Sequence, residues 1–287
     1  MFPIVEKRPL APNIYLMNVQ APKIAKKRKA GQFVILRISE EGERFPLTIV
    51  DSDAQAGTVT IVYQAVGKST RQLAALNVGE NILDLVGPLG NPTHTENFGR
   101  VVVIGGGVGI APVLPIVRAL KQAGNYVISI ISARSKDLII LEDEMRATSD
   151  ELLIATDDGS YGFKGFPTQI LKTMIDKGEK IDLVLSVGPP MLMKVTCDVT
   201  RPANIRTMVS LNPIMVDGTG MCGGCRVEVG GKTRFVCVDG PEFDGHQVNY
   251  DLLMKRLRTY LDQEKESIAR LEHACKLAGA APALEKR

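Results

Sequence analysis

The stretch Val101-Val-Val-Ile-Gly-Gly-Gly-Val-Gly-Ile-Ala-Pro112 decides the fold. Its four leading apolar residues predict a buried strand, and the glycines predict a turn. A helix then begins near Ile110, because proline is accepted in the first turn of a helix. This arrangement directs backbone N–H groups toward a pyrophosphate. The glycines do not form G-x-G-x-x-G in either phase, so a tight structural turn is the alternative interpretation.

Downstream of this turn, predicted strands and helices alternate. A helical pattern runs to Ala123, and strands are predicted at residues 126–131, 152–155 and 183–187. Such alternation is typical of a doubly wound parallel sheet. The last of these strands leads into Gly188-Pro189 and another helix start. Two such turns therefore face the same carboxyl edge of the sheet, where ligands bind.

Upstream of Arg100, short apolar runs alternate with Gly, Pro and Asp turns. This spacing predicts an antiparallel barrel or sandwich. The predicted strands are residues 33–38, 46–50, 58–63 and 81–86.

Two segments of this first region have the chemistry to hold phosphate oxygens. Arg44 offers a guanidinium fork, and residues 67–70 offer helix-start amides and hydroxyls. The alternatives are a salt bridge at the rim for Arg44 and an ordinary N-cap for Ser69 or Thr70. Each signal is weak alone.

The strongest motif is Asp217-x4-Cys222-x2-Cys225-x11-Cys237, in a glycine-dense loop. Thiolates ligate iron, and glycines let backbone N–H groups approach the cluster sulfurs, so the motif favours an iron–sulfur site. Because three cysteines leave one ligand missing, Asp217 is the candidate fourth ligand. A structural zinc site and a redox Cys-x-x-Cys are the alternatives. Cys197 and Cys275 each stand alone, which favours simple packing.

Composition excludes several classes of protein. The chain has 287 residues, 45% of them hydrophobic, so disorder is excluded. A net charge of +3 leaves no surplus for nucleic acid or for an anionic membrane. Five cysteines, an odd number, do not form a paired secretory framework. Neither a signal peptide nor an apolar run of the ~20 residues that span a bilayer is present, so we expect a cytoplasmic protein.

The end of the chain predicts one amphipathic helix, either a flap over its own domain or a docking face. The apolar positions at helical spacing are Leu252, Leu253, Leu257, Tyr260, Leu261, Ile268, Leu271 and Cys275.

Five motifs together resemble the ferredoxin–NADP reductase superfamily over nearly the whole chain. The narrower resemblance is to the small subunits of electron-bifurcating NADH-dependent reduced ferredoxin:NADP oxidoreductases, also known as sulfide dehydrogenase beta subunits. Electron-transfer subunits of dihydroorotate dehydrogenase are close relatives and have cysteine where Asp217 stands. The motifs are Arg44-Phe-Pro-Leu-Thr48, Gly67-Lys-Ser-Thr70, Gly105-Gly-Gly-Val-Gly-Ile-Ala-Pro112, Asp157-Asp-Gly-Ser-Tyr-Gly162 and the loop from Ser210 to Cys225.

The resemblance implies three cofactors and four regions. These are an FAD-binding β-barrel (1–97), an NAD(H)-binding α/β domain (98–206), a [2Fe-2S] module (207–246) and a C-terminal amphipathic helix with a tail (247–287). Ser132-Ala-Arg134 resembles the 2′-phosphate pocket of NADP-specific members, whereas the narrower group favours NAD. The implied site residues are Arg44, Pro46, Leu47 and Thr48 at the flavin; Gly67, Lys68, Ser69 and Thr70 at its pyrophosphate; Gly106, Gly107, Val108, Gly109, Arg134, Asp157, Gly188 and Pro189 at the nicotinamide nucleotide; and Asp217, Cys222, Cys225 and Cys237 at the cluster.

The implied function is electron transfer without a catalytic acid or base. Hydride would pass between NAD(H) and FAD, and single electrons would pass through the cluster to a large flavin and iron–sulfur subunit of a heterodimer. The full reaction couples NADPH oxidation to reduction of NAD and, through the large subunit, of ferredoxin. One alternative is the electron-transfer subunit of a dihydroorotate dehydrogenase or of a sulfide or polysulfide reductase. Another is a zinc-stapled nucleotide-binding regulator.

Overall fold

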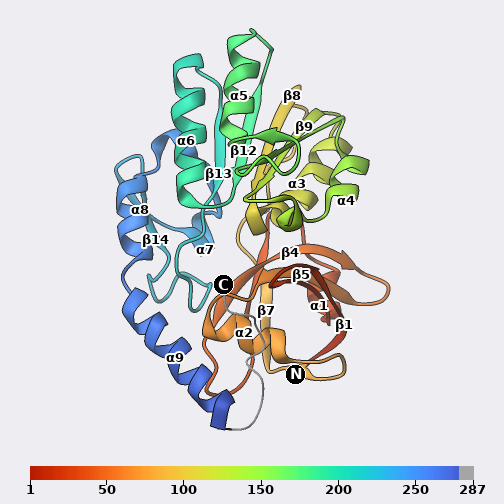
Figure 1. The fold of residues 1–287 in the computed structure, drawn as a ribbon, viewed down its shortest axis with the longest axis vertical. Helices are drawn as coiled ribbons and strands as arrows, with labels where there is room; N and C mark the ends of the chain where they lie inside the picture. Colours follow the sequence, from red (N-terminus) through yellow and green to blue (C-terminus); the bar gives the residue numbers. More distant parts are fainter. Residues whose placement is uncertain (278–287) are drawn as a thin grey trace.

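Two large sheets and a small C-terminal module make up the molecule (Figure 1). The computed structural model describes residues 1–277, with only the backbone of Cys275 and Leu277. The expectation of packing at Cys275 and the end of the predicted tail, residues 278–287, lie outside the described residues. Among the described helices, none is long and apolar enough to cross a membrane.

The first sheet has seven strands in the order β6-β1-β2-β5-β4-β3-β7, and every pair of neighbours is antiparallel. Its two outermost strands, β6 and β7, are consecutive in the chain, so the sheet curls into a nearly closed barrel around an apolar core. The predicted barrel is confirmed. Its elements are β1 (Phe2–Ala11), β2 (Ile14–Gln20), α1 (Pro22–Ala25), β3 (Phe33–Arg37), β4 (Phe45–Asp53), β5 (Thr58–Gln64), α2 (Lys68–Ala75), β6 (Asn81–Ile82) and β7 (Asp84–Leu89).

The second sheet has the order β11-β10-β9-β8-β12-β13-β16 and is parallel except at β16. Alternate residues of β8 pack on opposite faces: Val101 and Val103 on the α3 side, Val102 and Ile104 on the α5 side. Helices thus cover both faces, which confirms the doubly wound architecture. The elements are β8 (Arg100–Gly106), η1 (Gly107–Gly109), α3 (Ile110–Gln122), β9 (Tyr126–Ala133), η2 (Lys136–Leu138), α4 (Glu142–Thr148), β10 (Glu151–Thr156), β11 (Phe163–Lys164), α5 (Pro167–Asp176), β12 (Leu183–Val187), α6 (Pro190–Thr200), η3 (Arg201–Ala203), β13 (Thr207–Ser210) and β16 (Glu242–Asp244).

The cysteine-bearing module is inserted between two strands of the second sheet. β13 pairs with β12, so this sheet continues beyond residue 206. Within this module, β14 and β15 form an antiparallel hairpin. Where one C-terminal helix is expected, the structure has two: α8 contacts α6, and α9 contacts α2 (Figure 1). The remaining elements are β14 (Arg226–Val229), β15 (Lys232–Phe235), α7 (Val236–Asp239), η4 (Gly245–Gln247), α8 (Tyr250–Leu257) and α9 (Leu261–Leu277).

Candidate functional site

The two glycine turns of the second sheet lie side by side at its carboxyl edge. A Cβ on Gly109 would stand 2.7 Å from the carbonyl oxygen of Val187 and 3.0 Å from the Cα of Gly188. A Cβ on Gly106 would stand 2.5 Å from a methyl group of Leu192, in α6. Because the neighbours of Gly109 are backbone atoms, only glycine permits that approach, and the turn before α3 and the Gly188-Pro189 turn form one continuous backbone surface.

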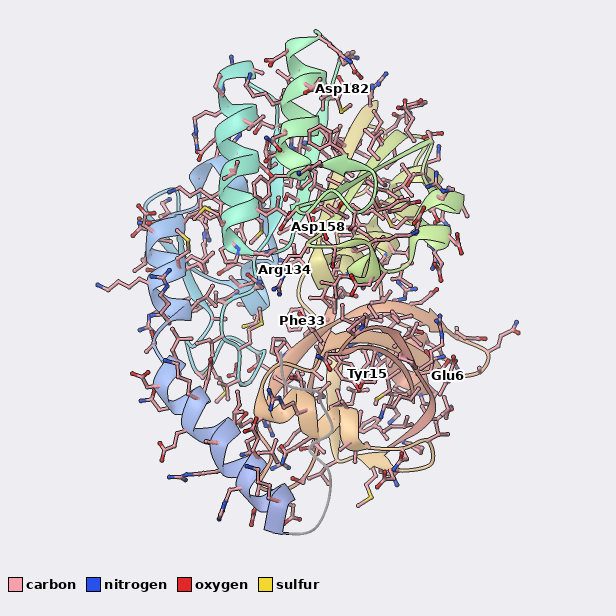
Figure 2. The ribbon with its side chains drawn as sticks, in the orientation of Figure 1. Glu6, Tyr15, Phe33, Arg134, Asp158 and Asp182 are labelled. Atoms are coloured by element: carbon pink, nitrogen blue, oxygen red, sulfur yellow. The ribbon has the colours of Figure 1, made fainter. Side chains whose placement is uncertain are left out.

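The ends of β9 and β10 extend this surface. The amide of Asp157 donates to the carbonyl oxygen of Ala133 at 3.2 Å, and the amide of Asp158 donates to that of Arg134 at 3.1 Å. Arg134 and Asp157 are exposed. Figure 2 shows Arg134 and Asp158 near the junction of the second domain with the barrel. The structure therefore brings both predicted residues to the same edge as the glycine turns.

A polar network supports the loop after β10. The Tyr161 hydroxyl donates to Glu142 at 2.8 Å, and Lys136 lies 5.1 Å from the centre of the Tyr161 ring. Burial alone would raise the pKa of Glu142, but hydrogen bonds from Arg146 and Tyr161 outweigh burial and lower that pKa. Glu142 therefore stays ionised and supports the loop. Nothing in the local sequence pattern points to it.

The start of α2 holds an anionic side chain that the sequence analysis missed. The Ser69 hydroxyl donates to the carboxylate of Glu43, and the Lys68 ammonium lies 3.8 Å from the same carboxylate. Thr70 acts as a local cap, because its hydroxyl oxygen accepts from the amide of Gly67 at 3.0 Å. A carboxylate at a helix N-terminus is stabilised by the same amides and dipole that stabilise a phosphate. The residues at this position fit an anionic group.

The predicted flavin-lining strand presents one face to the cysteine module. In β4, Leu47 packs against the barrel core. Pro46 and Thr48 point the other way and pair with Ile35 and Phe33 of β3. Ile35 and Phe33 belong to the apolar cluster that also contains Cys225 and Cys237. Arg44 is exposed just before this strand.

The cysteine loop brings two thiols together. The Sγ atoms of Cys225 and Cys237 lie 3.2 Å apart, and both residues are buried. Burial, reinforced by the neighbouring Cys225, raises the pKa of the Cys237 thiol to about 12. Backbone amides also approach sulfur: Gly224 N–H donates to Cys222 Sγ at 3.4 Å, and Cys237 N–H donates to Cys225 Sγ at 3.5 Å.

Asp217 is held at the start of the same loop. Its carboxylate accepts from the amide of Cys222 at 3.0 Å and from that of Thr219 at 3.1 Å. Burial opposes ionisation, but these hydrogen bonds prevail and lower the pKa of Asp217. Within the described part of the chain, no three His, Cys, Asp or Glu side chains converge as a metal site. The donor set of three thiols and one carboxylate, with amides directed at sulfur, nevertheless fits an iron–sulfur cluster.

Comparisons with known proteins bear on each part of this description. Residues 212–249 match the iron–sulfur cluster binding domain of dihydroorotate dehydrogenase B. A solved structure described under flavin-based electron bifurcation, from an NADH-dependent reduced ferredoxin-NADP oxidoreductase, is 44% identical with a TM-score of 0.90, covering 94% of this chain and 98% of that one. A ferredoxin NADP+ reductase from Neisseria gonorrhoeae shares the fold at 20% identity and a TM-score of 0.59, over 71% of this chain and 90% of that one.

Curated relatives agree with the structural match. A dihydroorotate dehydrogenase B electron transfer subunit from Streptococcus thermophilus is 34% identical over 84% of this chain and 94% of its own length. A homolog of that subunit from Thermotoga maritima is 47% identical over 93% of this chain and 94% of its own length. This chain therefore belongs to the family of dihydroorotate dehydrogenase B electron-transfer subunits and their homologues.

Proposed function

We propose that this chain is the small, electron-transferring subunit of a flavin-based bifurcating oxidoreductase. It exchanges hydride between NAD(H) and FAD and passes single electrons through a [2Fe-2S] cluster to a large flavin and iron–sulfur subunit. The complete heterodimer couples NADPH oxidation to reduction of NAD and ferredoxin. The observation that carries this proposal is the near full-length match, at a TM-score of 0.90, to a structure described under flavin-based electron bifurcation.

Each cofactor has a region of the chain whose residues fit it. We assign FAD to the barrel (1–97), NAD(H) to the α/β domain (98–206), the cluster to residues 207–246, and a covering or docking role to residues 247–287. The Glu43 carboxylate at the start of α2 supports the flavin pyrophosphate assignment, because it shows that this helix start holds an anion. The adjoining glycine turns support the nucleotide assignment.

When bound, FAD supplies a centre that exchanges hydride with NAD(H) and single electrons with the cluster. The chain's own residues bind and orient the cofactors. The amides at Gly107 and Gly109 would hold the nucleotide phosphates, with Arg134 and Asp157 nearby. Cys222, Cys225 and Cys237, with Asp217, hold the cluster beside the β4 face that carries Pro46 and Thr48. No side chain is needed to move a proton, and His94, His246 and His273 belong to none of these motifs.

The alternative partner is a dihydroorotate dehydrogenase, as the names of several relatives suggest. Asp217 in place of the cysteine of those subunits supports the bifurcating assignment instead. A zinc-stapled regulator is disfavoured by family membership, since the relatives are electron-transfer subunits. We also propose a cytoplasmic location, supported by the four described cysteines, none of which forms a disulfide.

Native purification with identification of the co-eluting large subunit tests the proposal. We expect a flavin and iron–sulfur partner that binds NADPH, together with flavin and cluster absorption and NADH-dependent dye reduction by the small chain. A dihydroorotate-oxidising partner would establish the alternative. A colourless protein without iron or sulfide would overturn every redox interpretation.

A further inference from the structure

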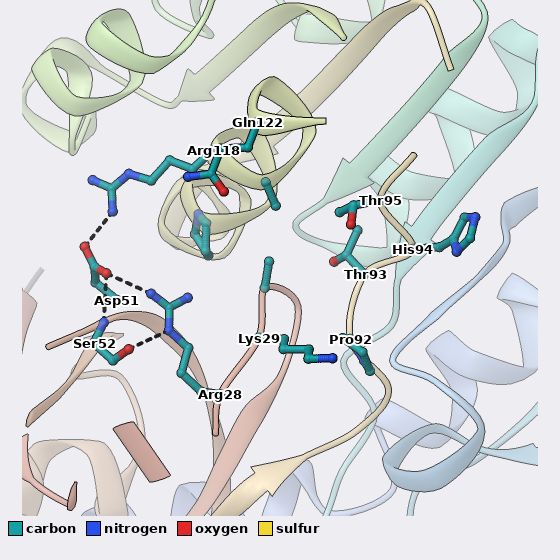
Figure 3. Close-up of a pocket in the computed structure, with 13 residues that line it drawn as sticks. Arg28, Lys29, Asp51, Ser52, Pro92, Thr93, His94, Thr95, Arg118 and Gln122 are labelled. Carbon is teal, nitrogen blue, oxygen red and sulfur yellow. Dashed lines mark hydrogen bonds and ion pairs between the residues drawn. The ribbon is translucent and has the colours of Figure 1, made fainter. Parts of the chain in front are cut away.

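A cavity of about 800 Å³ opens between the barrel and α3 (Figure 3). Barrel residues Arg28, Asp51 and Ser52 line one side, and Arg118 and Gln122 of α3 line the other. The motifs of the proposed function do not include any of these residues. The cavity therefore marks a contact between the two domains that the electron-transfer assignment leaves unexplained.

Asp51 joins the two sides of this cavity. One carboxylate oxygen accepts from Arg28 at 2.8 Å, and the other accepts from Arg118 at 2.5 Å (Figure 3). Arg28 is also held by Ser52, whose hydroxyl oxygen accepts from its Nε at 2.8 Å. A register shift between Ile49 and Asp51 in the pairing of β4 with β5 interrupts the regular alternation of side chains just before this carboxylate. We call Arg28, Asp51 and Arg118 the interdomain clamp.

Both ends of the interdomain clamp lie on elements that carry proposed ligand-binding residues. Asp51 follows Thr48 by three residues on β4. Arg118 lies on α3, which begins directly after the Gly107–Gly109 turn. Nine residues of helix span about 13–14 Å at 1.5 Å per residue, so one continuous helix, with Pro115 inside it, connects Arg118 to the turn. The clamp thus links β4, which carries the proposed flavin-binding residues, to the Gly107–Gly109 turn through α3.

This contact also has an apolar part. Val50 and Val62 of the barrel share one core with Val113 and Val117 of α3. Apolar burial holds surfaces together but is non-directional, so it resists separation more than rotation or sliding. Charge-assisted hydrogen bonds from two planar guanidinium groups to one carboxylate are directional. The clamp is therefore a directional part of the contact between the barrel and α3.

We propose that Asp51 is a positioning residue for hydride transfer: by holding Arg28 and Arg118 together, it sets the distance between the nicotinamide and the flavin. This inference rests on the proposed function. Hydride transfer is sensitive to such a distance, because a misplacement of about 1 Å can cost a reaction on the order of a hundredfold in rate. Asp51 touches neither ligand and acts only through β4 and α3.

The test compares Asp51→Asn with Asp84→Asn in the purified holo-complex. Asp84 forms a similarly exposed ion pair with Arg37 at 2.6 Å, but both partners lie within the barrel, so this variant is a matched control. Two readouts are followed in rapid anaerobic mixing with NADH: the rate constant of flavin reduction, and the long-wavelength charge-transfer absorption of stacked nicotinamide and flavin. Thermal unfolding, flavin content and the Kd for NADH are measured in parallel.

For Asp51→Asn we expect flavin reduction to slow about tenfold and the charge-transfer band to weaken, with flavin content and the Kd for NADH changed less than twofold. Asp84→Asn should keep wild-type kinetics. Arg118→Lys, which retains the charge, should recover part of the rate lost in Arg118→Gln. Unchanged kinetics and an unchanged band in Asp51→Asn would overturn the inference, as would equal losses in Asp84→Asn. If the wild-type flavin is not reduced by NADH at all, the proposed function fails instead.

Discussion

Two glycine-rich regions of this molecule show two physical reasons for glycine. In the Gly105 to Gly109 turn, the absent side chains make room for neighbouring backbone, as at Gly109 against Val187. In the cysteine loop, Gly218, Gly220 and Gly223 all have positive φ, and the nearest atom to a Cβ on Gly223 would be 3.7 Å away. Gly109 is therefore required by neighbouring backbone and Gly223 by its own positive φ. Each region also uses the other reason: Gly107 has positive φ with nothing within 4 Å of its Cβ, and a Cβ on Gly218 would lie 2.7 Å from Ile35 and Leu89.

The largest expected effect is in the cysteine loop. Cys225→Ser should abolish cluster absorption, because Cys225 and Cys237 are the thiols that the fold already brings together. Visible absorption and iron content measure the loss, while flavin content should stay near wild type. The buried Cys197, which contacts the Tyr250 hydroxyl at 3.3 Å, gives the control variant Cys197→Ala. Equal iron loss in both variants would contradict the assignment.

The second-largest expected effect is that of Gly109→Ala in the glycine turn. The new Cβ would lie 2.7 Å from the Val187 carbonyl oxygen, so the backbone must move. Overpacking of this kind costs about 1–3 kcal/mol, and displacement of the turn should weaken NADH binding about tenfold or more. Calorimetry measures the Kd for NADH, and thermal unfolding measures the loss of stability. Gly178→Ala is the control, because Gly178 has positive φ with nothing within 4 Å of its Cβ; it should lower stability and leave the Kd for NADH unchanged.

A finer test of the cysteine loop is Asp217→Cys. If the carboxylate ligates iron, a fourth thiolate should change the electron paramagnetic resonance spectrum and shift the reduction potential while the cluster is retained. Redox titration measures the shift. An unaltered potential and spectrum would remove Asp217 from the ligands and leave it as the hydrogen-bond acceptor of Cys222 and Thr219.

The smallest expected effect is a pH dependence at the strand that ends the cysteine module. Burial raises the pKa of Glu242 from its ordinary value to about 7, although a hydrogen bond from Thr93 opposes the shift. Between the ordinary value and about 7, the folded state binds more protons than the unfolded state, so stability falls as pH rises through this window. Glu242→Gln should remove this dependence. A difference of about 1 kcal/mol in the free energy of unfolding between pH 5 and pH 8 would appear as a Tm difference of about 2–4 °C. Identical slopes of Tm against pH in the wild type and in Glu242→Gln would refute this prediction.

Regular strands were the most predictable part of the fold. Residues 126–131 and 183–187 are dense in apolar residues because both faces of a central parallel strand are buried. The sequence pattern does not predict β1, because exposed Glu6 and Arg8 flank the half-buried Lys7, and Pro3 and Pro9 interrupt the pattern. It forms because it pairs with β2, which follows it directly in the sequence, and with β6, which is distant in the sequence.

The C-terminal helices show where periodicity alone was insufficient. One helical pattern covers α8 and α9, but a break separates them at residues 258–260. α8 packs beside α6 and α9 beside α2, where Arg71 pairs with Glu272 at 2.9 Å. The two helices thus serve different domains, so the chain must change direction between them. Hydrophobic spacing reports which face is apolar, not which partner covers it.

Residues close together in the chain define the candidate site chemistry: three thiols and a carboxylate in one loop, and two glycine turns, each at the end of a strand. Only the tertiary structure placed Glu43 at the start of α2, the Pro46 and Thr48 face against the cysteine module, and Asp51 between Arg28 and Arg118. The physical reason is how far apart in the sequence the interacting residues lie. Backbone conformation and ligand type are set by neighbouring residues, whereas the angle between domains depends on contacts between residues as distant as Asp51 and Arg118.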